Sequence, residues 1–241
     1  MFVHRAWFQI RNMGHGNEYT HLLDGSIDDW IQANGPSEDG LLPESLHKTR
    51  IPQTKNLDSS IASTSTSITE PSYEATDPQY VVNLEEMKSI VTDNDKKDND
   101  DDDDDDVEWI VVDVRNKERF LGQVEEPRPN MRLGHMPNAR NIFFLDLLNS
   151  PTNVNQLKSK EELQRILQQE GNIDVTKLVV SPGGSETTKT TKTKIVSSCG
   201  SGATACTLLA ALTVCGVPMD KCWLYDGSWS EWGSLPDTPI V

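Results

Sequence analysis

The sequence contains few cysteines, few basic residues and no long apolar run. Four of its 241 residues are cysteines, and 22 lysines and arginines stand against 38 aspartates and glutamates, for a formal net charge of −16 at pH 7. The cysteines form no Cys-x-x-Cys pair and have no histidine at metal-ligand spacing, so nothing predicts a metal site. No apolar stretch approaches the length that spans a bilayer. We therefore expect neither a membrane nor a nucleic acid as a partner.

Three segments are too polar to contribute to a core. Residues 41–76 are rich in serine, threonine, proline and acidic residues, which predicts a disordered linker. Residues 93–106 contain ten aspartates and two lysines and carry −8 of the formal charge, and residues 181–194 combine Ser-Pro-Gly-Gly with threonine and lysine. Both predict disordered insertions. For the aspartate run, weak binding of a divalent cation is the alternative.

The remaining segments are long enough for one domain with a core, and they alternate between two patterns. Extended patterns cover residues 80–82, 109–112, 140–143, 195–198 and 222–225, and helical patterns cover 84–91, 160–169 and the segment after 204. This alternation predicts an α/β fold with a mainly parallel sheet and helices on both faces. Ligands of such folds bind beyond the carboxyl ends of the strands, where Asp113 and Cys199 fall.

Cys199 stands where an apolar, β-type run gives way to a turn with two glycines and then to a helical pattern. Gly200 and Gly202 let backbone N–H groups converge on the sulfur, and the following helix directs its positive end toward it. A thiolate held in this way is stabilised and nucleophilic. The alternative is that the glycines only form a turn and that Cys199 is an inert buried thiol.

Several short motifs follow one another along the chain. They are Asp-x-Arg at 113–115, Arg-Phe-x-Gly at 119–122, Glu-Pro-Arg at 126–128, Gly-His-Met-Pro at 134–137, the Cys199 loop, and Tyr-Asp-Gly-Ser-Trp-Ser-Glu-Trp-Gly at 225–233. Together they resemble the rhodanese superfamily, most of all the second domain of the tandem-domain mercaptopyruvate and thiosulfate sulfurtransferases. The resemblance implies a rhodanese catalytic domain over residues 77–241, with a mainly parallel α/β sheet.

Residues 1–40 are similar to the carboxyl-terminal end of the first domain in the same family. Their pattern predicts an amphipathic helix, a short strand and a turn that leads to another helix. Most of a first domain is then absent, so we expect either a fragment or a start assigned inside a longer protein. The alternative is a transit peptide over residues 1–13, which carry Arg5 and Arg11 and no acidic residue.

The resemblance implies transfer of a sulfane sulfur from 3-mercaptopyruvate or thiosulfate, through a persulfide on Cys199, to a thiol or cyanide. The loop N–H groups are expected to hold the negative sulfur. These groups belong to Gly200, Ser201, Gly202, Ala203 and Thr204. No metal or organic cofactor is required.

Donor preference is expected to depend on the loop and on two arginines. In this family a Cys-Gly-Ser-Gly loop accompanies mercaptopyruvate, whereas arginine and lysine after the cysteine favour thiosulfate, so mercaptopyruvate is the expected donor. Arg119 and Arg128 match the positions that bind the carboxylate and keto oxygen, which suits a planar guanidinium group. Without the resemblance, both are surface arginines with weak salt bridges. Ser201 matches a serine that acts in proton transfer with an aspartate and a histidine of the first domain.

Two other classes of protein compete with this interpretation. A cysteine phosphatase of the related fold needs an arginine six positions after the cysteine, where this sequence has Ala205. A catalytically weak rhodanese-like binding or sulfur-relay module is the stronger alternative. The presence of Cys199 argues against an inactive module.

Other prominent residues are expected to have structural roles. His135 is expected to fix a turn, Asp113 to orient the end of its strand, and Asp226 with Trp229 to pack beneath the loop. Arg115 stays unassigned.

The other three cysteines are not expected to act in catalysis. Cys206 and Cys215 are expected to be core thiols, and Cys222 is either a buried thiol or a redox partner. An active thiol fits a reducing compartment, so we expect a cytoplasmic or mitochondrial protein. Its sulfur acceptor is expected to be thioredoxin or a low-molecular-weight thiol.

Overall fold

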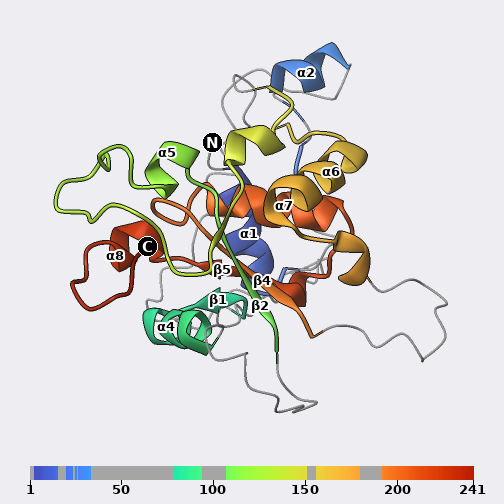
Figure 1. Ribbon diagram of the computed structural model, residues 1–241. Helices are drawn as coiled ribbons and strands as arrows, with labels where there is room; N and C mark the ends of the chain where they lie inside the picture. The colour runs from blue at the N-terminus through green and yellow to red at the C-terminus, as the bar shows by residue number, and fades with distance from the viewer. Residues whose placement is uncertain are drawn as a thin grey trace, which may run out of the picture. The chain divides into compact units, whose positions relative to one another are not determined.

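The computed structural model describes residues 3–15, 20–23, 25, 27–33, 79–93, 107–150, 156–179 and 192–241 (Figure 1). The chain divides into two compact units, one of residues 1–26 and 75–241 and one of residues 27–74. The second unit contributes helix α2 (Ile27–Gln32), which is described by itself. The predicted linker and most of the two predicted insertions lie outside the described residues.

A parallel sheet of five described strands forms the centre of the first unit, in the order β1-β5-β4-β2-β3. The strands are β1 (Val81–Val82), β2 (Trp109–Asp113), β3 (Arg140–Asn141), β4 (Lys194–Ser198) and β5 (Cys222–Tyr225). β2 and β4 pair along their whole length, from Trp109 opposite Lys194 to Asp113 opposite Ser198. This register places the carboxyl ends of the two strands side by side, as the sequence predicts.

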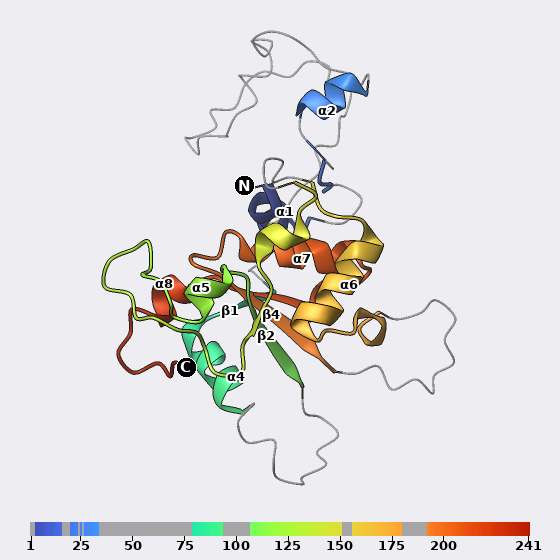
Figure 2. The ribbon, with the colours of Figure 1, turned by 45° about the horizontal axis from the view of Figure 1, so that its top comes forward.

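Alternate residues of the central strands face two separate cores. Val112 and Ile195 belong to the larger core, and Val111 and Val196 to the smaller one. Helices α1 (Val3–Asn12), α6 (Lys160–Gly171) and α7 (Ala205–Val214) cover the first face, and α4 (Leu84–Asp93) and α8 (Ser228–Trp232) cover the second (Figure 2). The predicted fold, a parallel α/β sheet with helices on both faces, is confirmed.

Helix α7 is apolar on every side, and it lies between the sheet and two other helices. Ala205, Cys206 and the six residues that follow are all buried, and α7 contacts α1, α6, β4 and β5. A helix that is hydrophobic all round is suited only to such a central position. It ends at Val214, and Gly216 follows with a φ of +95°.

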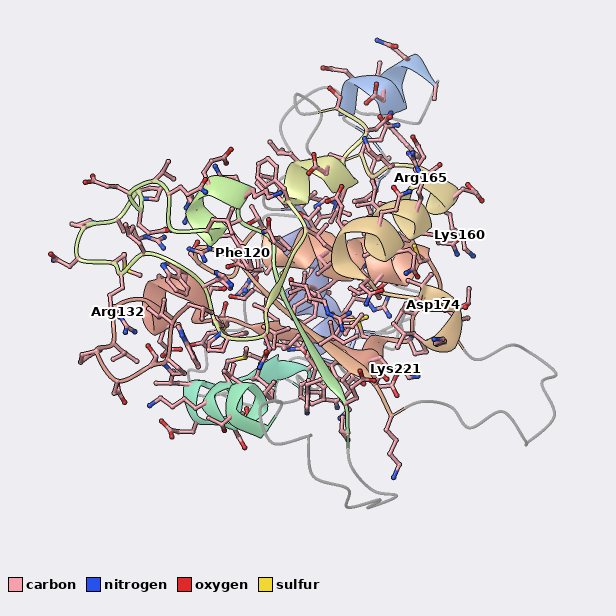
Figure 3. All side chains as sticks on the ribbon, viewed as in Figure 1. Phe120, Arg132, Lys160, Arg165, Asp174 and Lys221 are labelled. Carbon is pink, nitrogen blue, oxygen red and sulfur yellow. The ribbon has the colours of Figure 1, made fainter. Side chains whose placement is uncertain are left out.

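Helix α6 has the opposite pattern, with one buried and one exposed face. Leu163 and Leu167 are buried, whereas Lys160 and Arg165 are exposed (Figure 3). The helix begins at a capping box in which Ser159 and Glu162 satisfy each other's backbone N–H groups. Short 3-10 turns complete the unit at η1 (Phe144–Leu147), η2 (Val175–Lys177) and η3 (Met219–Lys221), and α5 (Lys117–Phe120) is a single turn.

The prediction of a strand within residues 1–40 is wrong for the residues of that region that the structure describes. The two helices of that region are present as α1 and α2, but none of the described residues between them is extended in a ladder. A strand needs a neighbouring strand to pair its backbone groups, and no described strand borders this segment. Instead, Asn12 at the end of α1 accepts hydrogen bonds from the N–H groups of Gln79 and Tyr80, at 3.1 and 2.8 Å.

Candidate active site

The loop of residues 199–204 joins the end of β4 to the start of α7. Cys199 is 2% exposed, and its Sγ accepts a hydrogen bond from the Ser201 N–H at 3.4 Å. The first turn of α7 follows at Ala205, so the positive end of this helix faces the loop. Both features place positive partial charge beside the loop that contains Cys199.

The start of α8 supports the loop from below. The Cys199 N–H donates to Ser228 Oγ at 3.1 Å, the Trp229 N–H donates to the Cys199 carbonyl at 2.9 Å, and the Ser230 N–H donates to the Gly200 carbonyl at 3.0 Å. Trp229 is buried at 1% exposure, as expected for a residue beneath the loop. These bonds hold the loop backbone while its side chains remain free to face a ligand.

Helix α1 contacts the same loop through Arg5. Arg5 Nη1 lies 2.6 Å from Asp226 Oδ1 and donates to the Gly202 carbonyl at 3.3 Å. Gly202 has a φ of +76°. A Cβ there would lie 2.5 Å from Asp226 Oδ1, so no larger residue fits. Asp226 therefore pairs with α1 and does not simply pack the final turn.

The other three cysteines are core thiols. Burial raises the pKa of Cys206 to about 12, that of Cys215 to about 11 and that of Cys222 to about 12. The expected core positions of Cys206 and Cys215 are confirmed, and Cys222 is a buried thiol. Cys199 differs because it lines a cavity of about 410 Å³, together with Arg119, Gly200, Ser201, Ala203 and Thr204.

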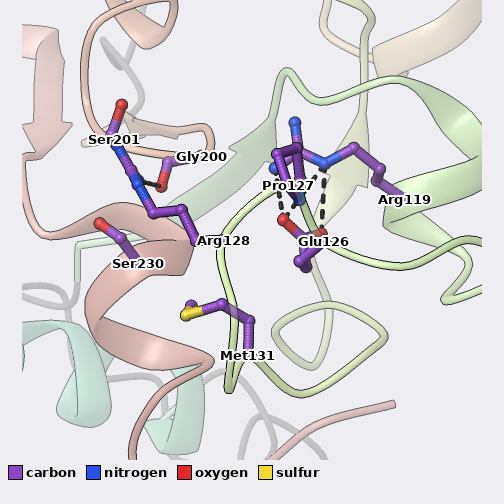
Figure 4. A pocket seen from close by; sticks show the side chains of 8 residues that line it. All are labelled: Arg119, Glu126, Pro127, Arg128, Met131, Gly200, Ser201 and Ser230. Carbon is purple, nitrogen blue, oxygen red and sulfur yellow. Dashed lines mark hydrogen bonds and ion pairs between the residues drawn. The ribbon is translucent and has the colours of Figure 1, made fainter.

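A second cavity of about 220 Å³ lies beside the first and shares three residues with it (Figure 4). Its lining consists of Arg119, Glu126, Pro127, Arg128, Met131, Gly200, Ser201 and Ser230. The side chain of Arg128 reaches the loop, where Nη1 donates to the Gly200 carbonyl at 3.2 Å. Two guanidinium groups thus stand beside the residues that follow Cys199.

A chain of buried charges leads from the sheet to Arg119. Arg115 is 1% exposed and lies 2.7 Å from Asp113 and 2.8 Å from Glu126. It also donates to the Gly134 carbonyl and lies 4.1 Å above the Trp229 ring. Arg115 is therefore structural, and Asp113 orients it by accepting from its backbone N–H and from Nε.

His135 lies outside this chain of charges, against Phe120. Its Nδ1 is 2.8 Å from the Phe120 carbonyl, its ring stacks on the Phe120 ring, and burial lowers its pKa. Its backbone pairs with Val241. His135 thus has the structural position that the sequence indicates.

The structure places the predicted site residues in or beside the Cys199 loop. Six of them line the cavity at Cys199, Arg128 lines the adjoining one, and Gly202 is a buried residue of the loop itself. Sequence analysis missed the parts played by Arg5, Glu126 and Ser228. Glu126 stood within a motif, but nothing in the sequence pairs it with an arginine.

The family of the chain follows from a comparison with protein-family models. The model described as the rhodanese-like domain matches residues 92–235. The chain therefore belongs to the rhodanese-like domain family, as its motifs suggest.

Named relatives of the chain are sulfurtransferases. The 3-mercaptopyruvate sulfurtransferase of Escherichia coli K12 is 37% identical over 130 residues, which cover 54% of this chain and 38% of that protein. The 3-mercaptopyruvate sulfurtransferase of Rattus norvegicus is 29% identical over 228 residues, covering 95% of this chain and 57% of that protein. The chain thus spans between 38% and 57% of the length of these curated relatives.

A solved structure is also similar to the chain. The sulfur transferase subunit of yeast mitochondrial complex I, seen by cryo-EM, is 31% identical with a TM-score of 0.50, and the match covers 71% of this chain and 49% of that one. No helix in the described part of this chain is long and apolar enough to cross a bilayer.

Proposed function

We propose that the chain is a sulfurtransferase that carries a sulfane sulfur on Cys199. The observation that carries the proposal is the position of this thiol: it lies in the loop between β4 and α7 and lines a cavity that Arg119 also lines. The names of the relatives support the same reaction class. The catalytic domain of this proposal comprises residues 77–241.

The proposed reaction has two steps. The Cys199 thiolate attacks the sulfur of 3-mercaptopyruvate, a sulfur–sulfur bond forms, and the carbon–sulfur bond breaks. The carbon fragment leaves as an enolate, takes up one proton and becomes pyruvate. A thiol acceptor then attacks the outer sulfur, departs as a persulfide, and returns Cys199 to the thiolate.

Each predicted site residue has a role in this proposal. Arg119 and Arg128 bind the carboxylate and keto oxygen, because guanidinium groups form paired hydrogen bonds to such oxygens. Ser201 takes part in proton transfer, and its N–H already points at the sulfur. Gly200, Ala203 and Thr204 line the cavity and leave room for the outer sulfur, while Gly202 lets the loop turn.

Thioredoxin or a low-molecular-weight thiol is the proposed acceptor. Such acceptors are reduced in the cytoplasm and in mitochondria, the two compartments that suit an unprotected thiol. The second step requires only a thiolate that can reach Cys199 through the cavity.

The test is pyruvate release from 3-mercaptopyruvate in the presence of a thiol acceptor. We expect turnover that is lost in Cys199→Ser and that exceeds turnover of thiosulfate with cyanide. Cys215→Ala is the matched control, because this cysteine lies in the core and away from the loop. It should keep the activity of the parent chain.

Two outcomes contradict the proposal. Turnover that survives Cys199→Ser would place the chemistry elsewhere. A folded chain without turnover of either donor would indicate a rhodanese-like binding or sulfur-relay module.

A further inference from the structure

Glu126 is a nearly buried carboxylate between two guanidinium groups. Its side chain is 4% exposed, with Oε1 2.8 Å from Arg115 Nη1 and Oε2 2.5 Å from Arg119 Nη2. It also lines the cavity of about 220 Å³ (Figure 4). The sulfur transfer described above assigns it no role.

Glu126 determines which edge of the Arg119 guanidinium group faces the cavity of about 220 Å³, called the cleft below. Nε and Nη2 of Arg119 both donate to Glu126, so that edge is occupied. The other edge, formed by Nη1 and Nη2, lies beside Gly200: a Cβ on this glycine would be 3.7 Å from Nη1 and 3.1 Å from Nη2. A donor anion therefore meets the edge that Glu126 leaves open.

Glu126 also sets the charge of the cleft. Asp113, Arg115, Glu126 and Arg119 form an alternating chain whose formal charges cancel. Among the described residues Arg128 has no ion pair, so it supplies one positive charge that is not balanced. Because the pair of Glu126 and Arg119 is mostly shielded from water, its charges act more strongly on a bound anion than surface charges do.

One unbalanced positive charge matches a singly charged donor better than a dianion. The anion 3-mercaptopyruvate carries one carboxylate charge at neutral pH, whereas thiosulfate carries two negative charges. We propose that Glu126 is a specificity-determining residue that favours singly charged sulfur donors over dianionic ones. This inference rests on the proposed sulfurtransferase function, because it concerns the donor site of that reaction.

The test measures binding in place of turnover, so that the two proposals can fail separately. In a Cys199→Ser background, calorimetry gives the Kd of thiosulfate and of 3-mercaptopyruvate. Adding Glu126→Gln should lower the ratio of the thiosulfate Kd to the mercaptopyruvate Kd by about tenfold at low salt, and less at high salt. Glu125→Gln is the matched control, since it makes the same charge change at an exposed neighbour and should leave the ratio unchanged.

A second variant keeps the inference testable if Glu126→Gln does not fold. Arg128→Gln removes a positive charge without touching Arg115, and it should raise the same ratio. The inference is overturned if Glu126→Gln shifts both Kd values equally, if Glu125→Gln has the same effect, or if Arg128→Gln leaves the ratio unchanged. It is also overturned if no variant binds either anion. If the anions bind with the expected selectivity but the parent chain shows no turnover, only the proposed sulfurtransferase function is refuted.

Discussion

Gly202 lies where the Cys199 loop contacts Asp226 and Arg5. An added Cβ would meet the Asp226 Oδ1 at 2.5 Å and the Asp226 carbonyl at 2.7 Å. The backbone also has a φ of +76°, which side chains rarely adopt. Both restrictions apply three residues after Cys199, so they bear directly on the shape of the loop.

We expect Gly202→Ala to displace the loop and to reduce Cys199-dependent turnover by on the order of 100-fold. Gly216→Ala is the control, because Gly216 has a φ of +95° but its nearest neighbour would lie 3.7 Å from the added Cβ. It should cost about 1–2 kcal/mol of unfolding free energy from backbone strain alone and leave turnover intact. Thermal unfolding and pyruvate release measure the two effects. Equal losses of turnover in both variants would contradict this account.

At the scale of elements, the contact between α1 and α7 contains a buried histidine. His4 of α1 is 1% exposed, and its Nδ1 lies 3.2 Å from Thr207 Oγ1 on α7. Burial lowers the pKa of His4 from 6.5 to about 4. The folded chain thus keeps this histidine neutral under conditions in which the unfolded chain protonates it.

This difference predicts a loss of stability in mild acid. Since the folded pKa lies below the unfolded one, the unfolded state binds more protons between pH 6.5 and 4, and stability falls as the pH falls through that window. The loss attributable to His4 reaches about 3 kcal/mol. Urea unfolding at several pH values should show it in the parent chain.

The comparison variant for this prediction is His4→Gln. Carboxylates titrate in both proteins, so the difference between the two pH curves isolates His4. The variant should lose less stability than the parent between pH 6.5 and 4. Parallel curves would show that His4 does not titrate on unfolding.

At the scale of the whole molecule, Arg115 joins parts of the chain that are far apart in sequence. It pairs with Asp113 at the end of β2 and with Glu126 in the following loop, and it lies over the ring of Trp229 in α8. These contacts connect the centre of the sheet to the support beneath the Cys199 loop. Arg115 also lines the cavity at Cys199, so the arrangement links the shape of the site to contacts made far from it in sequence.

We expect Arg115→Met to lower the free energy of unfolding by about 3–5 kcal/mol, because it leaves Asp113 and Glu126 as buried carboxylates with a partner removed. Arg119→Met removes a guanidinium group that is 23% exposed and leaves Arg115 paired with Glu126. It should cost less than Arg115→Met, because only Glu126 loses a partner and Asp113 keeps its own. Urea unfolding of the two variants at neutral pH provides the measurement. Equal costs would show that the buried chain of charges does not hold the fold together.

Much of the fold could be predicted from local pattern. The strand at 109–112 is observed as β2 with one further residue, and the strand at 195–198 as β4 with one residue before it. In the expected extended segment at 140–143, strand pairing ends with β3 at Asn141, although Phe143 is still extended before η1 begins at Phe144. Such segments are readable because buried strands and helices need apolar residues at fixed intervals.

The sequence alone determined the α/β class and the position of Cys199 between a strand and a helix. These properties depend on neighbours in sequence and on short motifs. The tertiary structure decided that Arg5 pairs with Asp226, that Glu126 holds Arg119, and that Ser228 supports the loop. The pairs with Asp226 and Ser228 join residues 221 and 29 positions apart, and Glu126 lies on a loop without periodic pattern. Only the packing of the sheet and its helices brings such groups within hydrogen-bonding distance.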